Sequence, residues 1–245
     1  MNADQKRDFL RRVADPIQGW LLPFAAMRTM DLLDFQEARG FEGGVLEVGV
    51  FCGKYFSLLL HSANTTNGAA VGIDTFEAAP VNQVIDLLGR NGADASRVQM
   101  LTGYSREFSA DDVRAHLRGP ARFVSVDGSH KKPDVIYDLL LSDAILAAEG
   151  IVAVDDFLNC LCLEVTEALI EYLAISRATL VPFAYIPNKL LLCRNGMCEI
   201  YARHLLSTIR ADPFDEIGRR FCETSRSDET KVFSTLAGSR VLICS

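Results

Sequence analysis

The chain has 245 residues, of which 49% are hydrophobic and 23% charged, so it contains enough apolar side chains for a sizeable globular core. Its 25 basic and 32 acidic residues give a net charge of -7, and no stretch gathers Lys and Arg into a face that would neutralise phosphates. We therefore expect a single domain that does not bind nucleic acid.

The sequence also lacks the signals of an exported or membrane protein. No run of about 18 apolar residues occurs, and no apolar stretch with a cleavage site follows the N-terminal charges. The seven cysteines show no CxxC spacing, which suits a reducing compartment, and we expect Cys193 and Cys198 to be reduced thiols facing each other across a hairpin. A soluble, cytoplasmic protein without membrane contact is predicted.

Short apolar runs alternate with helical stretches from residue 44 onward. Such alternation predicts parallel strands joined by crossover helices, in a doubly wound α/β sheet with helices on both faces. The expected strands are residues 44–50, 69–74, 97–103, 122–128 and 150–156, and the expected helices are residues 54–63, 81–90, 110–119, 134–150 and 163–176.

The pattern changes after this, because residues 178–186 and 188–202 look like strands without a helix between them. Asn195-Gly196 is a two-residue hairpin signal, so the sheet is expected to finish with an antiparallel hairpin. We divide the single domain 1–245 into a helical cap (1–40), a cofactor-binding core (41–200) and a C-terminal extension (201–245).

Function is expected at the carboxyl ends of the strands, where a parallel sheet binds its ligands. The first strand ends in "LEVGVFCG", which spaces Glu47, Gly49 and Gly53 before a helix. A dinucleotide loop needs glycine where Phe51 stands, and a carboxylate before the turn repels a pyrophosphate but attracts a cation. A nicotinamide-dependent oxidoreductase is therefore the weaker alternative.

These strand ends resemble the class I S-adenosylmethionine-dependent methyltransferases, which share the Rossmann-like fold and have this acidic and glycine spacing. In "GIDTF", Asp74 matches the residue that binds the ribose hydroxyls, and in "LTGYS", Gly103, Tyr104 and Ser105 match the loop that lines the adenine. The resemblance implies S-adenosyl-L-methionine as cofactor, with Glu47 facing its cationic part. Tight turns and helix caps are the structural alternatives for these residues.

Carboxylates end the next two expected strands. If "FVSVD" and "IVAVDD" are neighbours about 5 Å apart, Asp127 faces Asp155 and Asp156, and a hard divalent cation would relieve their repulsion. Mg²⁺ is predicted, with Mn²⁺ or Fe²⁺ as the alternatives. His130, three residues after Asp127, has an unperturbed pKa near 6.5 that suits a general base.

The same segment resembles the metal-dependent O-methyltransferases that act on sugar hydroxyls of macrolide and aminocoumarin antibiotics, over about residues 40–200. The stretch "IQGWLLP" (residues 17–23) is similar to the lead-in of that group. The resemblance implies that Asp127, Asp155 and Asp156 bind the metal and that His130 and Asp127 are catalytic, with Asp127 also near the cofactor; Lys131 and Lys132 are reserve candidates for the base.

The sequence thus predicts an O-methyltransferase that acts on a hydroxyl of a sugar, a glycosylated natural product or a catechol-like molecule. A metal-independent methyltransferase, an enzyme like the cephalosporin hydroxylase group and a cofactor-binding protein without catalysis stay open. A small-molecule substrate is the expected partner, with a homo-oligomer possible.

Overall fold

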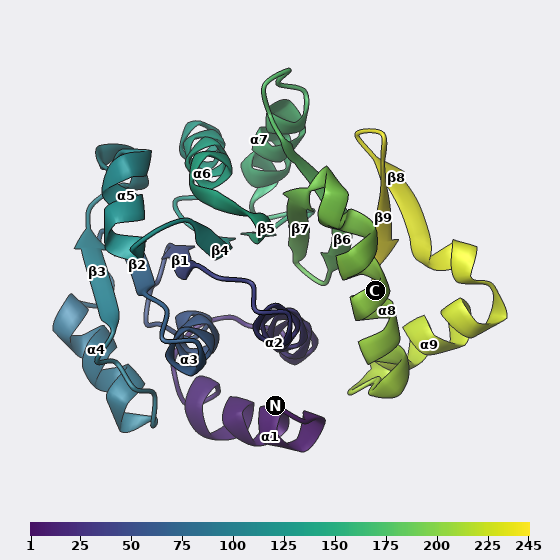
Figure 1. Ribbon diagram of the computed structural model, residues 1–245, viewed down its shortest axis with the longest axis horizontal. Coiled ribbons are helices and arrows are strands. Elements are labelled where there is room, and N and C mark those ends of the chain that lie inside the picture. Colours follow the sequence, from purple (N-terminus) through teal and green to yellow (C-terminus); the bar gives the residue numbers. More distant parts are fainter.

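The computed structural model describes all residues, 1–245, as one mixed α/β sheet covered by helices on both faces (Figure 1). The strands are β1 (Gly44–Val48), β2 (Ala70–Asp74), β3 (Val98–Thr102), β4 (Ala121–Val126), β5 (Leu146–Asp155), β6 (Leu180–Ile186), β7 (Lys189–Arg194), β8 (Phe233–Leu236) and β9 (Ser239–Ile243). The α-helices are α1 (Ala3–Phe9), α2 (Pro23–Ala38), α3 (Phe56–Thr65), α4 (Val81–Arg90), α5 (Ala110–Leu117), α6 (Lys132–Ile145), α7 (Leu163–Leu173), α8 (Cys198–Ala211) and α9 (Glu216–Ser227).

The nine strands lie in the order β3-β2-β1-β4-β5-β7-β6-β9-β8. The pairs from β3 to β5 are parallel, whereas β7 pairs antiparallel with both β5 and β6. The order reverses at β1, whose neighbours are β2 on one side and β4 on the other, and such a switch point opens a crevice at the strand ends. The predicted doubly wound sheet with its antiparallel hairpin is confirmed.

The central strands are apolar on both sides because helices cover both faces. On β1, Val45 belongs to a core of 44 buried residues shared with α2, α3 and α8, while Leu46 belongs to a core of 25 residues shared with α5, α6 and α7. Both residues are fully buried, as expected for a central parallel strand. In Figure 1, α5, α6 and α7 lie above the sheet and α1, α2 and α3 below it.

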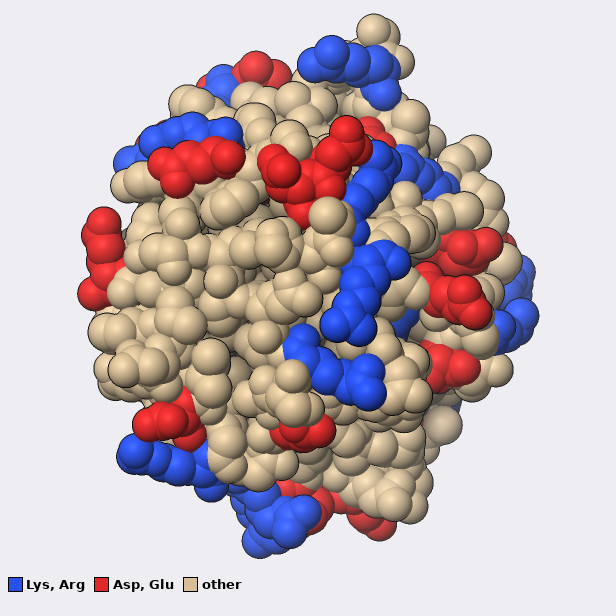
Figure 2. Space-filling model, turned by 60° about the vertical axis from the view of Figure 1, so that its left-hand side comes forward, with Lys and Arg blue, Asp and Glu red and all other residues tan.

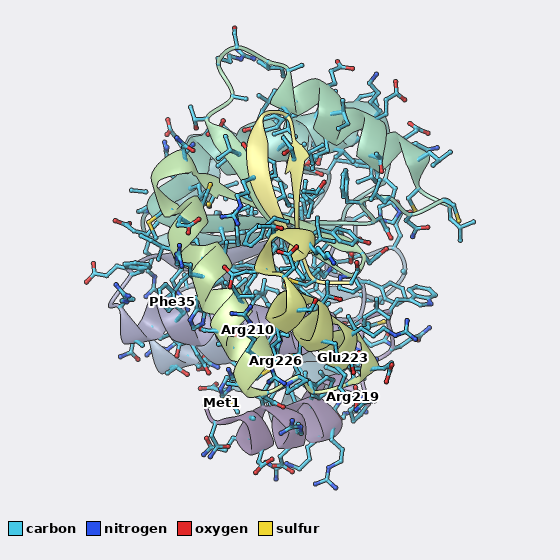
Figure 3. All side chains as sticks on the ribbon, turned by 90° about the vertical axis from the view of Figure 1, so that its right-hand side faces the viewer. Met1, Phe35, Arg210, Arg219, Glu223 and Arg226 are labelled. Carbon is cyan, nitrogen blue, oxygen red and sulfur yellow. The ribbon has the colours of Figure 1, made fainter.

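The C-terminal extension adds two helices and a hairpin at the far edge of the sheet. In Figure 3, α8 and α9 lie side by side, with Arg210 between them. The guanidinium of Arg210 donates to the backbone oxygen of Ser225 over 2.7 Å and pairs with Glu229 at 3.0 Å. β9 then pairs in parallel with β6, so this segment extends the same sheet.

Two boundaries differ from the sequence-based expectation. The helix expected over 134–150 ends at Ile145, and Leu146 already pairs with Ala121 in β5. While β4 advances from Ala121 to Phe123, β5 advances from Leu146 to Ile151, so the intervening residues bulge. Gly150 serves this bulge rather than a helix end, because a Cβ there would stand 2.5 Å from Cγ of Leu146.

The hairpin signal at Asn195-Gly196 was wrong. These residues form a 3₁₀ turn (Asn195–Met197) that leads into α8, and the hairpin turns instead between β6 and β7, where Ile186 pairs with Lys189. The side chain of Arg194 is held by Asp143, which fixes the end of β7 before Asn195. Cys193 and Cys198 lie 3.6 Å apart as free thiols, but from strand to helix rather than across a hairpin.

Candidate active site

A cavity of about 1150 Å³ opens at the carboxyl ends of β1, β2, β4 and β5, at the switch point of the sheet. This volume accommodates a cofactor together with part of a substrate. Its lining includes all the predicted site residues but one: Glu47, Asp74, Gly103, Tyr104, Ser105, Asp127, His130, Asp155, Asp156 and Gly49. The exception is Gly53, whose added Cβ would meet Val84 at 3.2 Å, so Gly53 packs under α4.

Glu47 lies at the bottom of the cavity with an unsatisfied carboxylate. Its side chain is 2% exposed, and the Oε2 atom has no hydrogen-bond partner. Burial, followed by the charge of Asp127, raises the pKa of Glu47 well above its usual value. A buried, unpartnered carboxylate on a cavity wall is suited to a cationic or hydrogen-bond-donating ligand.

Gly49 allows the ends of β1 and β4 to touch. Its φ is 86°, and a Cβ would stand 1.8 Å from the carbonyl oxygen of Asp127, inside any possible contact distance. The backbone N–H of Asp127 donates to the carbonyl of Val48 over 2.8 Å. Glycine is therefore required here for the fold of the site itself, beyond any closeness to a ligand.

Asp74, at the end of β2, holds the loop after β1. Its Oδ2 accepts from the N–H of Phe51 and its Oδ1 from the N–H of Phe76, both over 2.8 Å. Phe51 has a φ of 50°, so this carboxylate stabilises a left-handed residue. Its predicted contact with ribose hydroxyls would use the lone pairs that remain, and it stays a prediction.

The β3 loop brings a further acid into the site that the sequence reasoning missed. Ser105 is 7% exposed and, as a hydrogen-bonding partner, it limits the rise in the pKa of Asp138 on α6. Asp138 is 1% exposed, its Oδ1 has no partner, and burial raises its pKa to about 7. Its helical position among leucines indicated burial, but only the packing of α6 on this loop places it in the cavity.

His130 joins the carboxylates of two strands. Its Nε2 lies 3.1 Å from Oδ1 of Asp127 and 3.2 Å from Oδ2 of Asp156, and its Nδ1 lies 3.5 Å from Sγ of Cys162. Burial raises the pKa of Asp127 to about 6, and the hydrogen bond that His130 donates to Asp127 raises the pKa of His130. The imidazole is thus held between two acids at the cavity wall and is 38% exposed.

Asp155 has a different set of partners. Its Oδ2 lies 2.5 Å from Nζ of Lys189, and its Oδ1 accepts from the side-chain amide of Asn188 over 2.8 Å and from the N–H of Asp156 over 3.0 Å. The same amide donates to Oδ1 of Asp156 over 2.9 Å. Asn188 and Lys189 were not predicted as site residues; the only hint was a lysine opening the apolar run "KLLLC".

The metal site predicted from the sequence, at Asp127, Asp155 and Asp156, stays a prediction. The compact group of potential ligand atoms, all within 4.8 Å of one another, consists of His130, Asp156 and Cys162. Both oxygens of Asp155 are engaged by protein donors, one of them the ammonium of Lys189. The three-carboxylate arrangement of Asp127, Asp155 and Asp156 therefore does not fit a divalent ion without displacement of Lys189.

Strained backbone concentrates at this cavity. Phe51, His130, Asp156 and Asn188 all line it, with φ values of 50°, 58°, 58° and 70°. Left-handed non-glycine residues carry a conformational cost that the surrounding fold must overcome, and they gather at functional sites. Each of these strained residues lies in a different segment at the cavity: the loops after β1, β4 and β5, and the turn between β6 and β7.

The other predicted candidates lie elsewhere. Nζ of Lys131 pairs with Glu164 at 3.0 Å, and that of Lys132 pairs with Glu167 at 2.7 Å, so both reserve candidates for the base face α7 outside the cavity. The three other histidines also lie outside the cavity. The ring of His61 packs against that of Phe9, and His116 and His204 form hydrogen bonds with the side chain of Gln99 and the backbone carbonyl of Asp31.

The face of the molecule shown in Figure 2 carries charges of both signs. In Figure 2 acidic and basic side chains both appear there, among a larger area of uncharged atoms. None of the helices combines the length and apolar character that a transmembrane segment requires.

Comparison with known proteins agrees with this site. Residues 46–157 match the family model described as a methyltransferase domain. No curated protein matches the sequence.

Solved structures share the fold at low sequence identity. The O-methyltransferase NovP has a TM-score of 0.58 at 14% identity, covering 69% of this chain and 80% of its own. CalS11, a TDP-rhamnose 3'-O-methyltransferase of calicheamicin biosynthesis, has a TM-score of 0.55 at 17% identity, covering 80% and 82%.

A third structure carries ligands. The MycE methyltransferase of the mycinamycin pathway, in complex with Mg and SAH, has a TM-score of 0.55 at 19% identity, covering 79% of this chain and 55% of its own. The matched segment runs from β1 to the end of β5, which is the part of the sheet that builds the cavity. Residues 46–157 therefore match a methyltransferase domain, and the chain shares the fold of these solved methyltransferases.

Proposed function

We propose that this protein is a methyltransferase that transfers a methyl group from S-adenosyl-L-methionine to a hydroxyl oxygen of a small molecule. The observation that carries the proposal is the placement of His130 in the same cavity as the unpartnered carboxylate of Glu47. One group is able to accept a proton, and the other is able to receive the cationic part of the cofactor.

The cofactor half of the cavity is assigned to the ends of β1, β2 and β3. Glu47 would face the amino or sulfonium end, Asp74 the ribose, and the loop of Gly103, Tyr104 and Ser105 the adenine. Support comes from the orphaned oxygen of Glu47 and from Gly103, whose φ of 143° is a conformation that favours glycine. When bound, the cofactor supplies a methyl group on a positively charged sulfur.

The acceptor half is assigned to His130 and its carboxylates. The acceptor hydroxyl oxygen attacks the methyl carbon in line with the carbon–sulfur bond, that bond breaks, and S-adenosyl-homocysteine is the other product. The imidazole of His130 takes the hydroxyl proton, and Asp127 and Asp156 stabilise the imidazolium that forms. The bent loops supply alignment, which is a large part of such a rate enhancement.

The rim of the cavity supports an acceptor with a large apolar part. Trp20 and Leu161 line the cavity and are each 89% exposed, and Leu22 is 46% exposed. Exposed apolar side chains grouped at a cavity mouth are typical of a ligand-binding surface. Among the predicted acceptors, this favours a glycosylated natural product over a free sugar.

Metal assistance stays a separate prediction. Mg²⁺ or Mn²⁺ at Asp127, Asp155 and Asp156 is supported by the excess of carboxylates in the cavity and by the Mg bound in the MycE structure. The ammonium of Lys189 on Asp155 opposes it. No step of the proposed reaction passes through a metal.

The test is a methyl-transfer assay with labelled cofactor and a panel of glycosides, catechols and free sugars, read by mass spectrometry. The expected product is a methyl ether of one glycoside, formed by the wild type and lost in His130→Gln. Binding of S-adenosyl-homocysteine, measured by calorimetry, should persist in the variant. Methylation only at nitrogen or carbon, or full activity in His130→Gln, would contradict the proposal.

A further inference from the structure

Lys189 is a buried cation at the centre of the acidic site. It opens β7 and lies directly opposite Asp155 in the antiparallel register, with Nζ 2.5 Å from Oδ2 of that residue. Nζ also lies 4.4 Å from the ring centroid of Tyr55, and the side chain is 4% exposed. Such a cation is held in place by a short ion pair and by the face of an aromatic ring.

The charges around Lys189 are otherwise of one sign. Glu47, Asp127 and Asp155 all interact electrostatically with its ammonium, and Asp74 and Asp156 line the same cavity. The cavity has one other basic side chain of the Lys or Arg type, Lys54, whose Nζ contacts the carbonyl of Gly19 at 3.3 Å. Lys189 is therefore the fixed positive charge that balances the carboxylates.

A divalent cation bound by these carboxylates would occupy the position of the Lys189 ammonium. It would have to approach Asp155, both of whose oxygens already have donors, and it would meet the repulsion of an ammonium a few ångströms away. Displacing Lys189 would leave a buried charge without its partner, which is strongly unfavourable.

We propose that Lys189 is the resident counter-ion of this carboxylate cluster and occupies the position at which a divalent metal would otherwise bind. The inference deepens the proposed function, since it concerns the acceptor half of that site. It makes Lys189 a positioning residue, which holds Asp155 and, through the shared Asn188 bridge, Asp156 and His130 in place.

The experiment measures Mn²⁺ binding rather than turnover. The full chain is titrated with Mn²⁺, and the free ion is followed by electron paramagnetic resonance. The wild type is expected to bind weakly, and Lys189→Met should bind at least about tenfold more tightly, because the repelling charge is gone while Asp155 is left unpaired. The double variant Lys189→Met with Asp155→Asn should lose that gain.

A matched control comes from the same cavity. Lys54→Met removes a lysine that has no carboxylate partner, so its affinity for Mn²⁺ should stay within about twofold of the wild type. Lys189→Gln, which keeps a donor for Asp155, serves as the second variant if thermal unfolding shows that Lys189→Met does not fold.

The outcomes separate the two proposals. Tight Mn²⁺ binding by the wild type, or no gain in either Lys189 variant, overturns the role of Lys189. S-adenosyl-homocysteine binding is measured on the same samples by calorimetry, and its absence in the wild type would overturn the proposed function while leaving the Mn²⁺ comparison to judge Lys189.

Discussion

Gly49 lies directly against the backbone of Asp127: a Cβ at position 49 would stand 1.8 Å from the Asp127 carbonyl oxygen, so one strand end would have to shift to admit it. This contact joins the ends of β1 and β4, and it brings the cofactor half and the acceptor half of the cavity together. The site is therefore sensitive to a single methyl group at this point.

Gly49→Ala is expected to lower the free energy of unfolding by about 3 kcal/mol or more, because the added methyl clashes with backbone and the φ of 86° is strained for alanine. Urea denaturation measures the change. Gly89→Ala in α4 is the control: nothing lies within 4 Å of its added Cβ, so stability should stay equal or rise by roughly 0.5–1 kcal/mol. Equal stability of Gly49→Ala and wild type would refute the contact.

His130→Gln is expected to lower kcat by about 10²–10⁴-fold, the usual contribution of a general base, with cofactor affinity changed less than about twofold. Steady-state kinetics and calorimetry measure the two effects. His116→Gln is the control, because His116 hydrogen-bonds Gln99 outside the cavity and should leave kcat unchanged.

The pH profile of the wild type follows from the same residue. The hydrogen bond that His130 donates to Asp127 raises the pKa of His130 above 6.5. A base acts in its unprotonated form, so kcat should rise with pH and level off only above that raised value. In Asp127→Asn the acid limb should move to lower pH. An acid limb that is the same in both proteins would contradict this assignment.

Asp138 predicts a pH dependence of stability. Burial raises its pKa from 3.8 to about 7 in the folded protein, so folding takes up a proton; the resulting stability is full below pH 3.8 and is lost as the pH rises to about 7. Asp138→Asn removes this loss, and above pH 7 it should be more stable than the wild type by up to about 4 kcal/mol. Urea denaturation between pH 4 and 8 tests it.

The control for that prediction is Asp111→Asn, whose side chain is 94% exposed and should leave the pH dependence unchanged. A constant difference between Asp138→Asn and the wild type across the pH range would show that Asp138 is ionised throughout.

Trp20→Ala is expected to raise KM for an apolar acceptor by roughly tenfold with kcat nearly unchanged, because the indole contributes buried contact area rather than chemistry. Trp20 stacks on Phe51, with ring centroids 6.1 Å apart, at the cavity mouth. Leu163→Ala provides the comparison: Leu163 is 68% exposed but does not line the cavity, and its loss should leave KM unchanged. Equal KM values in all three proteins would show that Trp20 at the cavity mouth does not contribute to substrate binding.

The local sequence pattern was sufficient to predict an element wherever the pattern of one helix or strand was clear by itself. The helix expected over 81–90 is α4 with the same bounds, and the acidic strand ends at Asp74, Asp127 and Asp155 lie at one edge of the sheet, as parallel strands require. The prediction of element bounds failed where a helical and a strand pattern overlapped. The apolar residues after Ile145 continue a helical pattern, yet their pairing with β4 makes them a strand.

The amino-acid sequence by itself determined the alternating elements and the acidic residues at their ends, because periodicity and turn residues act within a few positions of the chain. Only the tertiary structure decided which partners those acids have. Lys189 reaches Asp155 through antiparallel pairing across 34 positions of sequence, and Asp138 reaches Ser105 through helix packing. Charge balance depends on distance in space, and no local pattern encodes it.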